Sequence, residues 1–303
     1  MILFWIFAGI TLFGIMGYLL QILAVRLYTA PPNSEEGNCL PRTFQPVSIL
    51  KPLKGLDDGL FDNLESFCNL DYPQYELIFA LQNHNDQAYK VVSKIKEKYP
   101  SKDITIVVEH CNEGLNPKVN NLIPAHQRAK YGLILISDSN VRVENNYLTA
   151  ITRHMDDPSV GLVSNMIRGV SGRSLGAIME NLHLNSFIVG SVCFLDKYLR
   201  MPCVIGKSML MRKAELEAIG GFRSVKDFLA EDYIIGERIH RLGKKVILSS
   251  HLINNVNEYW GIKRFINRHT RWGKLRWQIG GAKYLSELAG NAVFIPLLVC
   301  VPR

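Results

Sequence analysis

Strand-like and helix-like patterns of hydrophobic residues alternate through the first half of the chain. Nearly continuous apolar runs typical of buried strands occur at residues 47–53, 75–81, 104–109 and 132–140. Between these runs, apolar residues recur at the spacing of amphipathic helices at residues 59–70, 86–100 and 116–130. This alternation predicts βαβ units and an α/β fold with a mostly parallel, twisted sheet. Ligands of such sheets bind beyond the carboxyl ends of the strands, where this chain has the polar runs QNHND, EHCNEG and DSN.

The chain begins with a long uncharged segment. Residues 2–25 contain no charged side chain, and at about 1.5 Å per residue they can cross a hydrocarbon core of roughly 30 Å. A signal peptide would have a basic start and a shorter apolar run, so we predict a retained transmembrane anchor at residues 1–27. Arg26, Lys51 and Lys54 follow the segment, and by the positive-inside rule they put the rest of the chain in the cytosol.

Changes in composition divide the remaining chain into four parts. A stretch rich in Pro, Asn, Ser and Glu predicts a linker at residues 28–45, before the α/β domain at 46–258. Residues 259–282 alternate basic with apolar and aromatic side chains, which predicts an amphipathic interfacial segment. The final part, 283–303, is hydrophobic but too short to span a membrane unaided, so it fits a re-entrant piece or the start of a further span.

Charge and cysteine content exclude some classes of protein. The formal net charge is +8, and most of the surplus lies in residues 260–281, which contain six Lys or Arg and no acid. No aromatic-basic RNA motif is present, so we expect no nucleic-acid partner. The six cysteines form no CxxC pair, which fits reduced thiols on a cytosolic face. The absence of GxxxxGK[ST], GxGxxG and GxSxG motifs argues against P-loop hydrolysis, Rossmann redox chemistry and serine hydrolysis.

Two aspartates follow predicted strands and are candidate site residues. Asp86 comes after the second strand and Asp138 after the fourth. A carboxylate at such a position can hold a ribose, or a divalent cation that bridges phosphates. Asp86 also fits a helix N-cap, which is the stronger interpretation of that residue alone, and Asp138 also fits a turn residue. Asp138 is the stronger functional candidate because the run LILIS directs it out of a buried strand.

Adjacent carboxylates, Glu231 and Asp232, stand at the start of another amphipathic helix, which ends near Gly243. They lie in its first turn, where the helix dipole stabilises negative charge. The functional alternative is a general base that accepts a proton from a substrate hydroxyl.

A basic motif, RHTRW, lies within the interfacial segment. Arg268, Arg271 and Trp272 are at helical spacing and share one face. Two guanidinium groups there can bind a diphosphate through bidentate hydrogen bonds, or they can lie on anionic lipid. The lipid interpretation is preferred for three other basic residues of this segment, Lys263, Lys274 and Arg276.

The order of these motifs resembles a known family. An Asp after a strand, an Asp in SDS, the run AEDY and then RxxRW resemble the GT-A glycosyltransferases with a D, D, D, (Q/R)xxRW signature. The runs VSILKPLKGLDDGLFDNLESF, LDYPQYEL, GLNPKVNNL, SDSNVRV and LAEDYIIG are similar to the ceramide glucosyltransferase-like family, glycosyltransferase family 21. The resemblance covers roughly residues 45–280 and implies a GT-A fold. In two respects the chain differs: QNHND has asparagines where relatives carry acids, and relatives continue beyond Arg303 through further hydrophobic segments.

The resemblance also implies roles for the acidic residues. Asp86 would lie at the nucleotide, and Asp138 would hold a divalent metal, Mg²⁺ or Mn²⁺, together with the sugar diphosphate. Asp232 rather than Glu231 would be the catalytic base, a choice that rests on the resemblance alone.

The basic and amide residues receive roles from the same resemblance. Lys118 and Asn120, in NPKVNN, would lie near the uridine diphosphate. Arg268, Arg271 and Trp272 would form the RxxRW element near the diphosphate and the acceptor.

The resemblance, together with the anchor and the basic segment, implies an inverting, UDP-sugar-dependent hexosyltransferase with its catalytic domain on the cytosolic face of a membrane. The predicted donor sugar is glucose, and the predicted acceptor is the hydroxyl of ceramide or a similar lipid in the bilayer. The membrane would be a bacterial inner membrane or the Golgi or ER of a eukaryote. Two alternatives stay open: a processive polysaccharide synthase, which would need more spans, and a non-catalytic basic module associated with the membrane.

Overall fold

The computed structural model describes residues 2–30 and 43–281 of the chain. Most of the predicted linker, residues 31–42, and the hydrophobic C-terminal segment, residues 282–303, lie outside the described residues.

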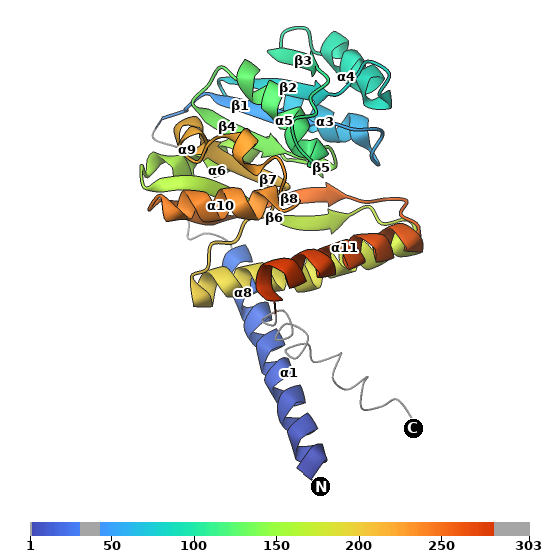
Figure 1. Ribbon diagram of the computed structural model, residues 1–303, viewed down its shortest axis with the longest axis vertical. Helices are drawn as coiled ribbons and strands as arrows, with labels where there is room; N and C mark the ends of the chain where they lie inside the picture. The colour runs from blue at the N-terminus through green and yellow to red at the C-terminus, as the bar shows by residue number, and fades with distance from the viewer. Residues whose placement is uncertain (1, 31–42, 282–303) are drawn as a thin grey trace.

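A single mixed sheet of eight strands forms the centre of the described domain (Figure 1). Its strand order is β3-β2-β1-β4-β7-β6-β8-β5. The first four of these run parallel to one another, and β7 is antiparallel to both of its neighbours, β4 and β6. β6 and β8 pair in parallel, and β5 pairs antiparallel to β8. The strands are β1 (Val47–Pro52), β2 (Tyr75–Leu81), β3 (Ile104–Val108), β4 (Leu133–Ser137), β5 (Val141–Arg142), β6 (Val160–Val170), β7 (Ser208–Arg212) and β8 (Lys245–Val256).

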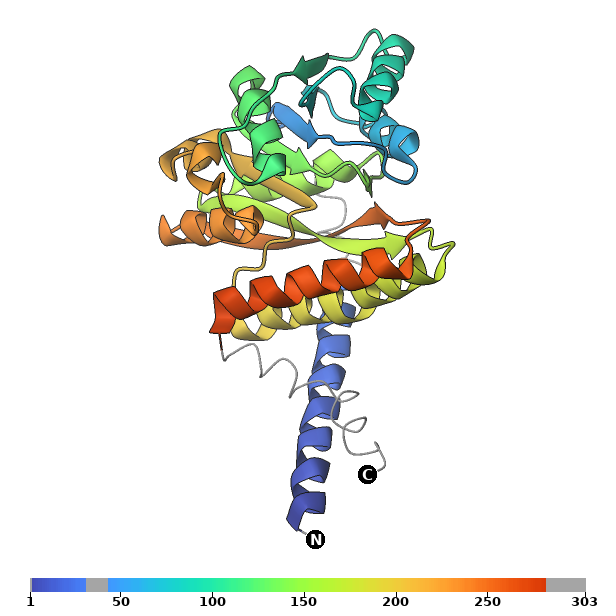
Figure 2. The same cartoon turned by 45° about the vertical axis from the view of Figure 1, so that its right-hand side comes forward.

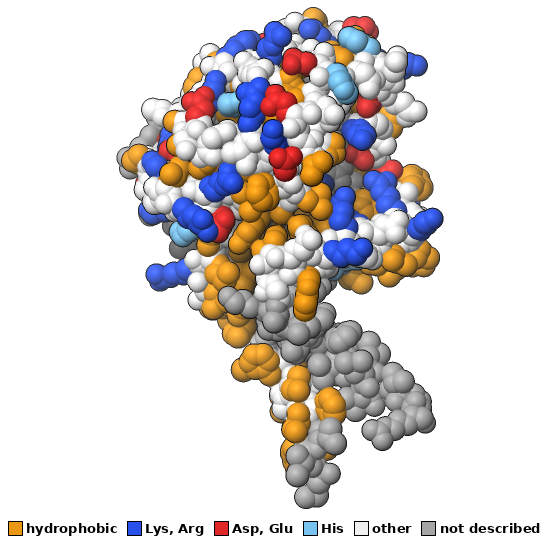
Figure 3. Space-filling view, in the orientation of Figure 1, with side chains coloured by type: hydrophobic (Ala, Val, Ile, Leu, Met, Phe, Trp, Pro, Cys, Tyr) orange, Lys and Arg blue, Asp and Glu red, His pale blue; other side chains and the backbone are white. Residues whose placement is uncertain are grey.

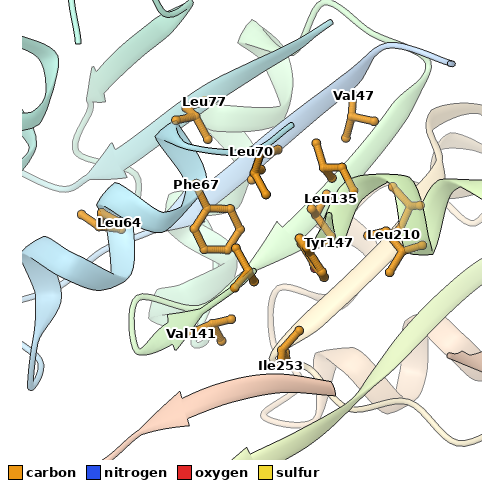
Figure 4. Close-up of a cluster of buried hydrophobic side chains, with 14 of the residues drawn as sticks. Val47, Leu64, Phe67, Leu70, Leu77, Leu135, Val141, Tyr147, Leu210 and Ile253 are labelled. Atoms are coloured by element: carbon orange, nitrogen blue, oxygen red, sulfur yellow. The ribbon is translucent and has the colours of Figure 1, made fainter. Parts of the chain in front are cut away.

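Helices cover both faces of the sheet, which explains why its strands are almost continuously apolar. All six residues of β1 are buried, because alternate side chains enter cores on opposite faces. Ile49 packs on one face with α3, α4 and α6, in the core that Figure 4 shows around Phe67 and Tyr147. Leu50 packs on the other face with α5, α9 and α10. The mostly parallel α/β sheet predicted from the alternating pattern is confirmed.

The helices lie in two sets. Those that cover the sheet are α3 (Leu60–Cys68), α4 (Gln87–Lys98), α5 (Pro117–Arg128), α6 (Tyr147–Thr152), α9 (Lys213–Ala218) and α10 (Glu231–Arg241), with short 3₁₀ turns η1 (Arg153–Asp156) and η3 (Phe222–Val225). The others lie at the β6–β8 side of the domain: α1 (Ile2–Thr29), α7 (Leu175–His183), α8 (Val189–Leu199) and α11 (Ile262–Gly280).

Three helices of the second set, α7, α8 and α11, form a layer beside the domain (Figures 1 and 2). A π-helical turn, η2 (Leu184–Ile188), joins α7 and α8 into one long helix beside α11, and α1 projects away from both (Figures 1 and 2). Two described helices are long and apolar enough to cross a membrane, Phe4–Thr29 and Leu175–Leu199. The first lies where the anchor was predicted; the second was not predicted. One face of α7 carries the exposed apolar side chains Leu175, Ile178, Met179 and Leu182.

Candidate active site

The loop after β1 links two strand ends of the parallel half-sheet. Gly55 in this loop has a φ of 68°, a conformation that favours glycine. Its backbone N–H lies 2.9 and 3.1 Å from the two carboxylate oxygens of Asp86 and donates to them. Asp86 is also the N-cap of α4 and accepts a hydrogen bond of 2.8 Å from the N–H of Ala88. It therefore fixes the loop after β1 against the start of α4, as the N-cap interpretation expects.

Asp138 lies directly after β4, between two lysine side chains. The ammonium groups of Lys118 on α5 and Lys207 just before β7 each lie 2.9 Å from one of its carboxylate oxygens. Burial would raise the pKa of Asp138, but the two ammonium groups outweigh burial and hold that pKa well below its usual range. Burial lowers the pKa of Lys207, against the effect of Asp138. Asp138 is therefore a fixed negative charge at neutral pH.

Lys118 connects Asp138 to the start of α10. Its ammonium group lies 3.0 Å from Oε1 of Glu231 and donates a 3.0 Å hydrogen bond to the carbonyl oxygen of Gly206. Burial would lower the pKa of Lys118, but Asp138 and Glu231 outweigh burial and raise it. Nδ2 of Asn116, the N-cap of α5, donates to the other oxygen of Glu231 at 3.0 Å. Both carboxylate oxygens of Glu231 therefore have partners at the start of α5.

Asp232 has a different environment from its neighbour Glu231. Its Oδ2 accepts a 2.9 Å hydrogen bond from the N–H of Gly206, and its Oδ1 accepts one of 2.8 Å from the N–H of Tyr233. Asp232 is partly exposed, whereas Glu231 is buried. Burial and the negative charge of Glu231 raise the pKa of Asp232 to about 6. A carboxylate with this pKa is mostly ionised at neutral pH and is more basic than an ordinary aspartate, as a proton acceptor should be.

The side chain of Asn120 turns to the loop before α5 and forms its two hydrogen bonds with Gly114. Its side-chain oxygen accepts a 3.0 Å hydrogen bond from the N–H of Gly114, and its amide donates one of 2.8 Å to the carbonyl of the same glycine. These two bonds support the loop before α5. Among the residues predicted for the nucleotide, Lys118 therefore joins the carboxylate cluster, while Asn120 and Asp86 hold loops around it.

The RxxRW residues lie in the middle of α11. Nε of Arg268 is 2.9 Å from Oε1 of Glu180 on α7. The guanidinium carbon of Arg268 lies 5.4 Å from the ring centroid of Trp260 and 4.8 Å from that of Trp272, within cation–π range. Trp272 is half-buried against the sheet core, and Arg271 is exposed.

The first turns of α11 are tied to the loop around Asp138. The hydroxyl of Ser139, the next residue, donates to the carboxylate of Asp57 in the loop after β1. The other oxygen of Asp57 lies 3.7 Å from the guanidinium of Arg264 on α11. Burial lowers the pKa of Arg268, while the charge of Asp138 acts on it in the opposite direction. The strand-end aspartate and the RxxRW helix therefore belong to one side of the molecule.

Two hollows lie along α11. A basic groove of about 610 Å³ is lined by Trp260, Lys263, Arg264, Asn267, Arg268 and Arg271. A larger cavity of about 770 Å³ separates α11 from the segment that leads into α10. Its apolar walls are Phe228, Leu229, Ala230, Ile234, Leu275 and Ile279. Figure 3 shows hydrophobic side chains gathered between the upper lobe and α11, with Lys and Arg side chains beside them.

Sequence comparison places this arrangement in a family. Residues 6–302 match the family described as Glycosyl transferase family 21. The chain belongs to this family. It is 32% identical over 262 residues to ceramide glucosyltransferase 3 of Caenorhabditis elegans and 32% identical over 267 residues to ceramide glucosyltransferase 1 of the same organism. Each alignment covers 86% of this chain but only 56% and 55% of those proteins, so the chain spans little more than half of their length.

The fold of this chain is also found in solved GT-A glycosyltransferases. A mannosyltransferase from Pyrobaculum calidifontis, determined in complex with GDP-Man and Mn²⁺, superimposes with a TM-score of 0.59 at 16% identity. That comparison covers 97% of this chain and 88% of the mannosyltransferase. Residues 1–349 of TarS from S. aureus superimpose with a TM-score of 0.51 at 16% identity, over 80% of this chain and 77% of that one. The family and the fold that the motifs predicted are both confirmed.

Several residues of the candidate site have no distinctive sequence signal. Lys207 stands alone in the run GKSM, and Gly206 beside it contacts Asp232 only after folding. Lys51 is fully buried in β1 and donates 2.8 Å to the backbone carbonyl of Asp138, so it fixes the strand end. For Lys51, the available sequence signal was a charged residue near the end of an otherwise apolar strand. Glu180 lies in a helix that the hydrophobic pattern did not identify.

The residues around Asp138 fit a divalent metal only in part. No group of three or more His, Cys, Asp or Glu side chains suited to a metal occurs among the described residues. Each oxygen of Asp138 already has a lysine ammonium as its partner. Mg²⁺ is commonly held by one or two carboxylates together with substrate phosphates. The donor set therefore fits a metal shared with a phosphate and does not fit a metal held by the protein alone.

Proposed function

We propose that this chain is the catalytic part of an inverting hexosyltransferase that transfers glucose from UDP-glucose to the hydroxyl of a membrane lipid such as ceramide. The observation that carries the proposal is the continuous network of Asp138, Lys118 and Glu231 with Asp232, beside the basic face of α11. The sugar and the lipid are supported by the two nematode relatives, which are ceramide glucosyltransferases, and a nucleotide-sugar donor is supported by the mannosyltransferase solved with GDP-Man.

Asp232 is the proposed general base. Its raised pKa and partial exposure suit a carboxylate that takes the proton from the attacking lipid hydroxyl. The oxygen of that hydroxyl forms a bond to the anomeric carbon as the bond from this carbon to the diphosphate breaks, so the configuration inverts in one displacement. Glu231 is less suited to this role because it is buried and its carboxylate is paired with the ammonium group of Lys118.

Positive side chains are proposed to hold the departing diphosphate. Lys118, Lys207 and Arg268 supply fixed charge where negative charge develops on the leaving group. Asp138 is proposed to hold a divalent metal jointly with the diphosphate, and such a cation would add positive charge to the leaving group. Asp86 is proposed to support the nucleotide side of the site through the Gly55 loop.

The lipid acceptor is proposed to enter through the cavity between α11 and the start of α10. This cavity combines apolar walls with Arg271 and Lys274, and its inner wall leads to the helix that carries Asp232. The apolar helix α1 and the exposed apolar side chains along α7 support a site at a membrane surface, which we propose to be cytosolic.

A transfer assay with defined components tests the proposal. The purified chain in lipid nanodiscs is incubated with ceramide, Mg²⁺ or Mn²⁺, and a panel of labelled UDP- and GDP-sugars. Formation of one monoglycosylated lipid with inverted anomeric configuration is expected from UDP-glucose. A labelled product of many sugar units would favour the polysaccharide synthase, and no transfer from any donor would contradict the proposal.

A further inference from the structure

Glu180 is a buried carboxylate that joins two helices of the lower layer. Only 1% of its side chain is exposed, and it lies on the face of α7 opposite the exposed apolar residues. Its Oε1 lies 2.9 Å from Nε of Arg268, and its Oε2 lies 3.0 Å from Nε2 of His269. Both partners belong to α11, so one carboxylate of α7 contacts two consecutive residues of the neighbouring helix.

The contact leaves most of the hydrogen-bonding capacity of Arg268 unused. A guanidinium group has five N–H donors, and the ion pair with Glu180 is made on the Nε side, at 2.9 Å. The four donors on the two terminal nitrogens are not consumed by Glu180. Because the side chain of Arg268 is 18% exposed and lines the basic groove, those donors are available to an anion in that groove.

Aromatic rings restrict Arg268 further. The indoles of Trp260 and Trp272 lie within cation–π range of its guanidinium group. An arginine on a helix surface normally samples many rotamers, and ordering such a side chain costs free energy at the moment of binding. Here the ion pair at Nε and the two indoles fix the side chain before any ligand arrives.

We propose that Glu180 is a positioning residue for Arg268, which it holds with its terminal nitrogens directed toward the diphosphate of the donor. This inference rests on the proposed function, because it takes a sugar diphosphate as the anion. A purely structural role, in which Glu180 only ties α7 to α11, is the alternative that the experiment must separate.

Direct binding of UDP separates the two roles. UDP affinity is measured by titration calorimetry on the full chain in nanodiscs for the wild type, E180Q, E180D and R268K. The control is E237Q, which removes an arginine-paired carboxylate on α10 away from the site. We expect E180Q to weaken UDP binding about tenfold, the scale of one hydrogen bond between a misplaced Arg268 and the charged diphosphate. We expect E180D to restore part of that loss and E237Q to bind UDP as the wild type does.

The double variant E180Q/R268K provides the decisive comparison. If Glu180 acts through Arg268, the double variant binds UDP no more weakly than R268K alone. Additive losses would overturn the inference, as would an E180Q protein that melts at a lower temperature with unchanged UDP affinity and donor KM. No UDP binding by the wild type would contradict the proposed function itself, whereas wild-type binding that E180Q leaves unchanged contradicts only the role of Glu180.

Discussion

The backbone N–H of Gly206 donates a 2.9 Å hydrogen bond to Oδ2 of Asp232. A β-carbon added at position 206 would lie 2.4 Å from that oxygen, so this close approach requires glycine. The carbonyl of the same residue accepts from Lys118. One peptide segment thus orients both the proposed base and the lysine that bridges the carboxylates.

Substitution of Gly206 should therefore displace Asp232. We expect G206A to lower the rate of glucose transfer at least about 100-fold, the scale of losing a positioned general base. The matched control is G132A, because a β-carbon at Gly132 meets no atom within 4 Å. Initial rates in nanodiscs measure both variants. A G206A enzyme as active as G132A would contradict the role of this contact.

Removal of the carboxylate of Asp232 should affect chemistry more than binding. D232N keeps the shape of the side chain but cannot take a proton, so kcat should fall about 10²- to 10⁴-fold. UDP affinity should stay near the wild-type value because the proposed diphosphate partners are unchanged. Transfer rate and calorimetric UDP binding are measured together, with E237Q as the control. If D232N retains wild-type kcat, another group is the base.

Transfer activity should depend on the ionisation of Asp232. Because its pKa is raised to about 6, the basic form is lost as pH falls below that value. We expect kcat/KM to decrease about tenfold for each pH unit below about 6 and to level off above it. A profile of kcat/KM from pH 5 to 8 measures this, with thermal melting at each pH to exclude unfolding. A midpoint near 4 would contradict the raised pKa.

Lys118 should contribute strongly to stability at neutral pH. K118M removes one of the two ammonium partners of Asp138 and the ammonium partner of Glu231, and breaking a buried ion pair costs about 3 kcal/mol. The folded pKa of Asp138 is depressed, so its contribution is present above pH 4 and is lost as pH falls through the folded value. The melting difference from wild type should therefore shrink at low pH.

An exposed ion pair provides the control for that measurement. K98M breaks the contact between Lys98 and Glu65 at the surface, where such pairs contribute little. Equal melting temperatures for K118M and K98M across the pH range would show that the carboxylate cluster does not depend on Lys118.

Filling the cavity beside α11 should impair the use of the lipid but not of the donor. Leu275 lines the cavity, so L275W should occupy part of its volume. We expect a higher KM for long-chain ceramide, an unchanged KM for a short-chain soluble analogue and unchanged UDP affinity. The control is I266W, on an exposed position of α11 that does not line the cavity. Equal acceptor KM values for the two variants would contradict the proposed entrance.

The helices and strands of the first half of the fold could be predicted because the pattern of apolar residues within each short segment indicates its secondary structure. In β1 and α4 the pattern of apolar residues along a short stretch indicates the element, and both elements form where the pattern indicates. The long helix formed by α7 and α8 lacks such a pattern of apolar residues. Asn185 lies inside the long helix, where its amide exchanges hydrogen bonds with the backbone of Gly169 in β6, and that partner is known only after folding.

The site could be predicted only where motifs mark it. Asp138, Asp232 and the RxxRW residues stand in recognisable runs, whereas Lys207 is one lysine among many. Glu180 was missed because α7 reverses the usual arrangement: Ile178 and Leu182 face outward while the carboxylate faces inward. A pattern that assigns apolar residues to the interior therefore puts Glu180 on the wrong side of its helix.

The lysine pair around Asp138 has a consequence for the energetics of substrate capture. The side chains of Lys118 and Lys207 are only 22% and 16% exposed, and each already holds a carboxylate oxygen. Most of the cost of dehydrating these ammonium groups is therefore met during folding. An anion bound at this point, as proposed, would replace one oxygen partner by another, so its recognition would be an exchange of counter-ions without further dehydration of the lysines.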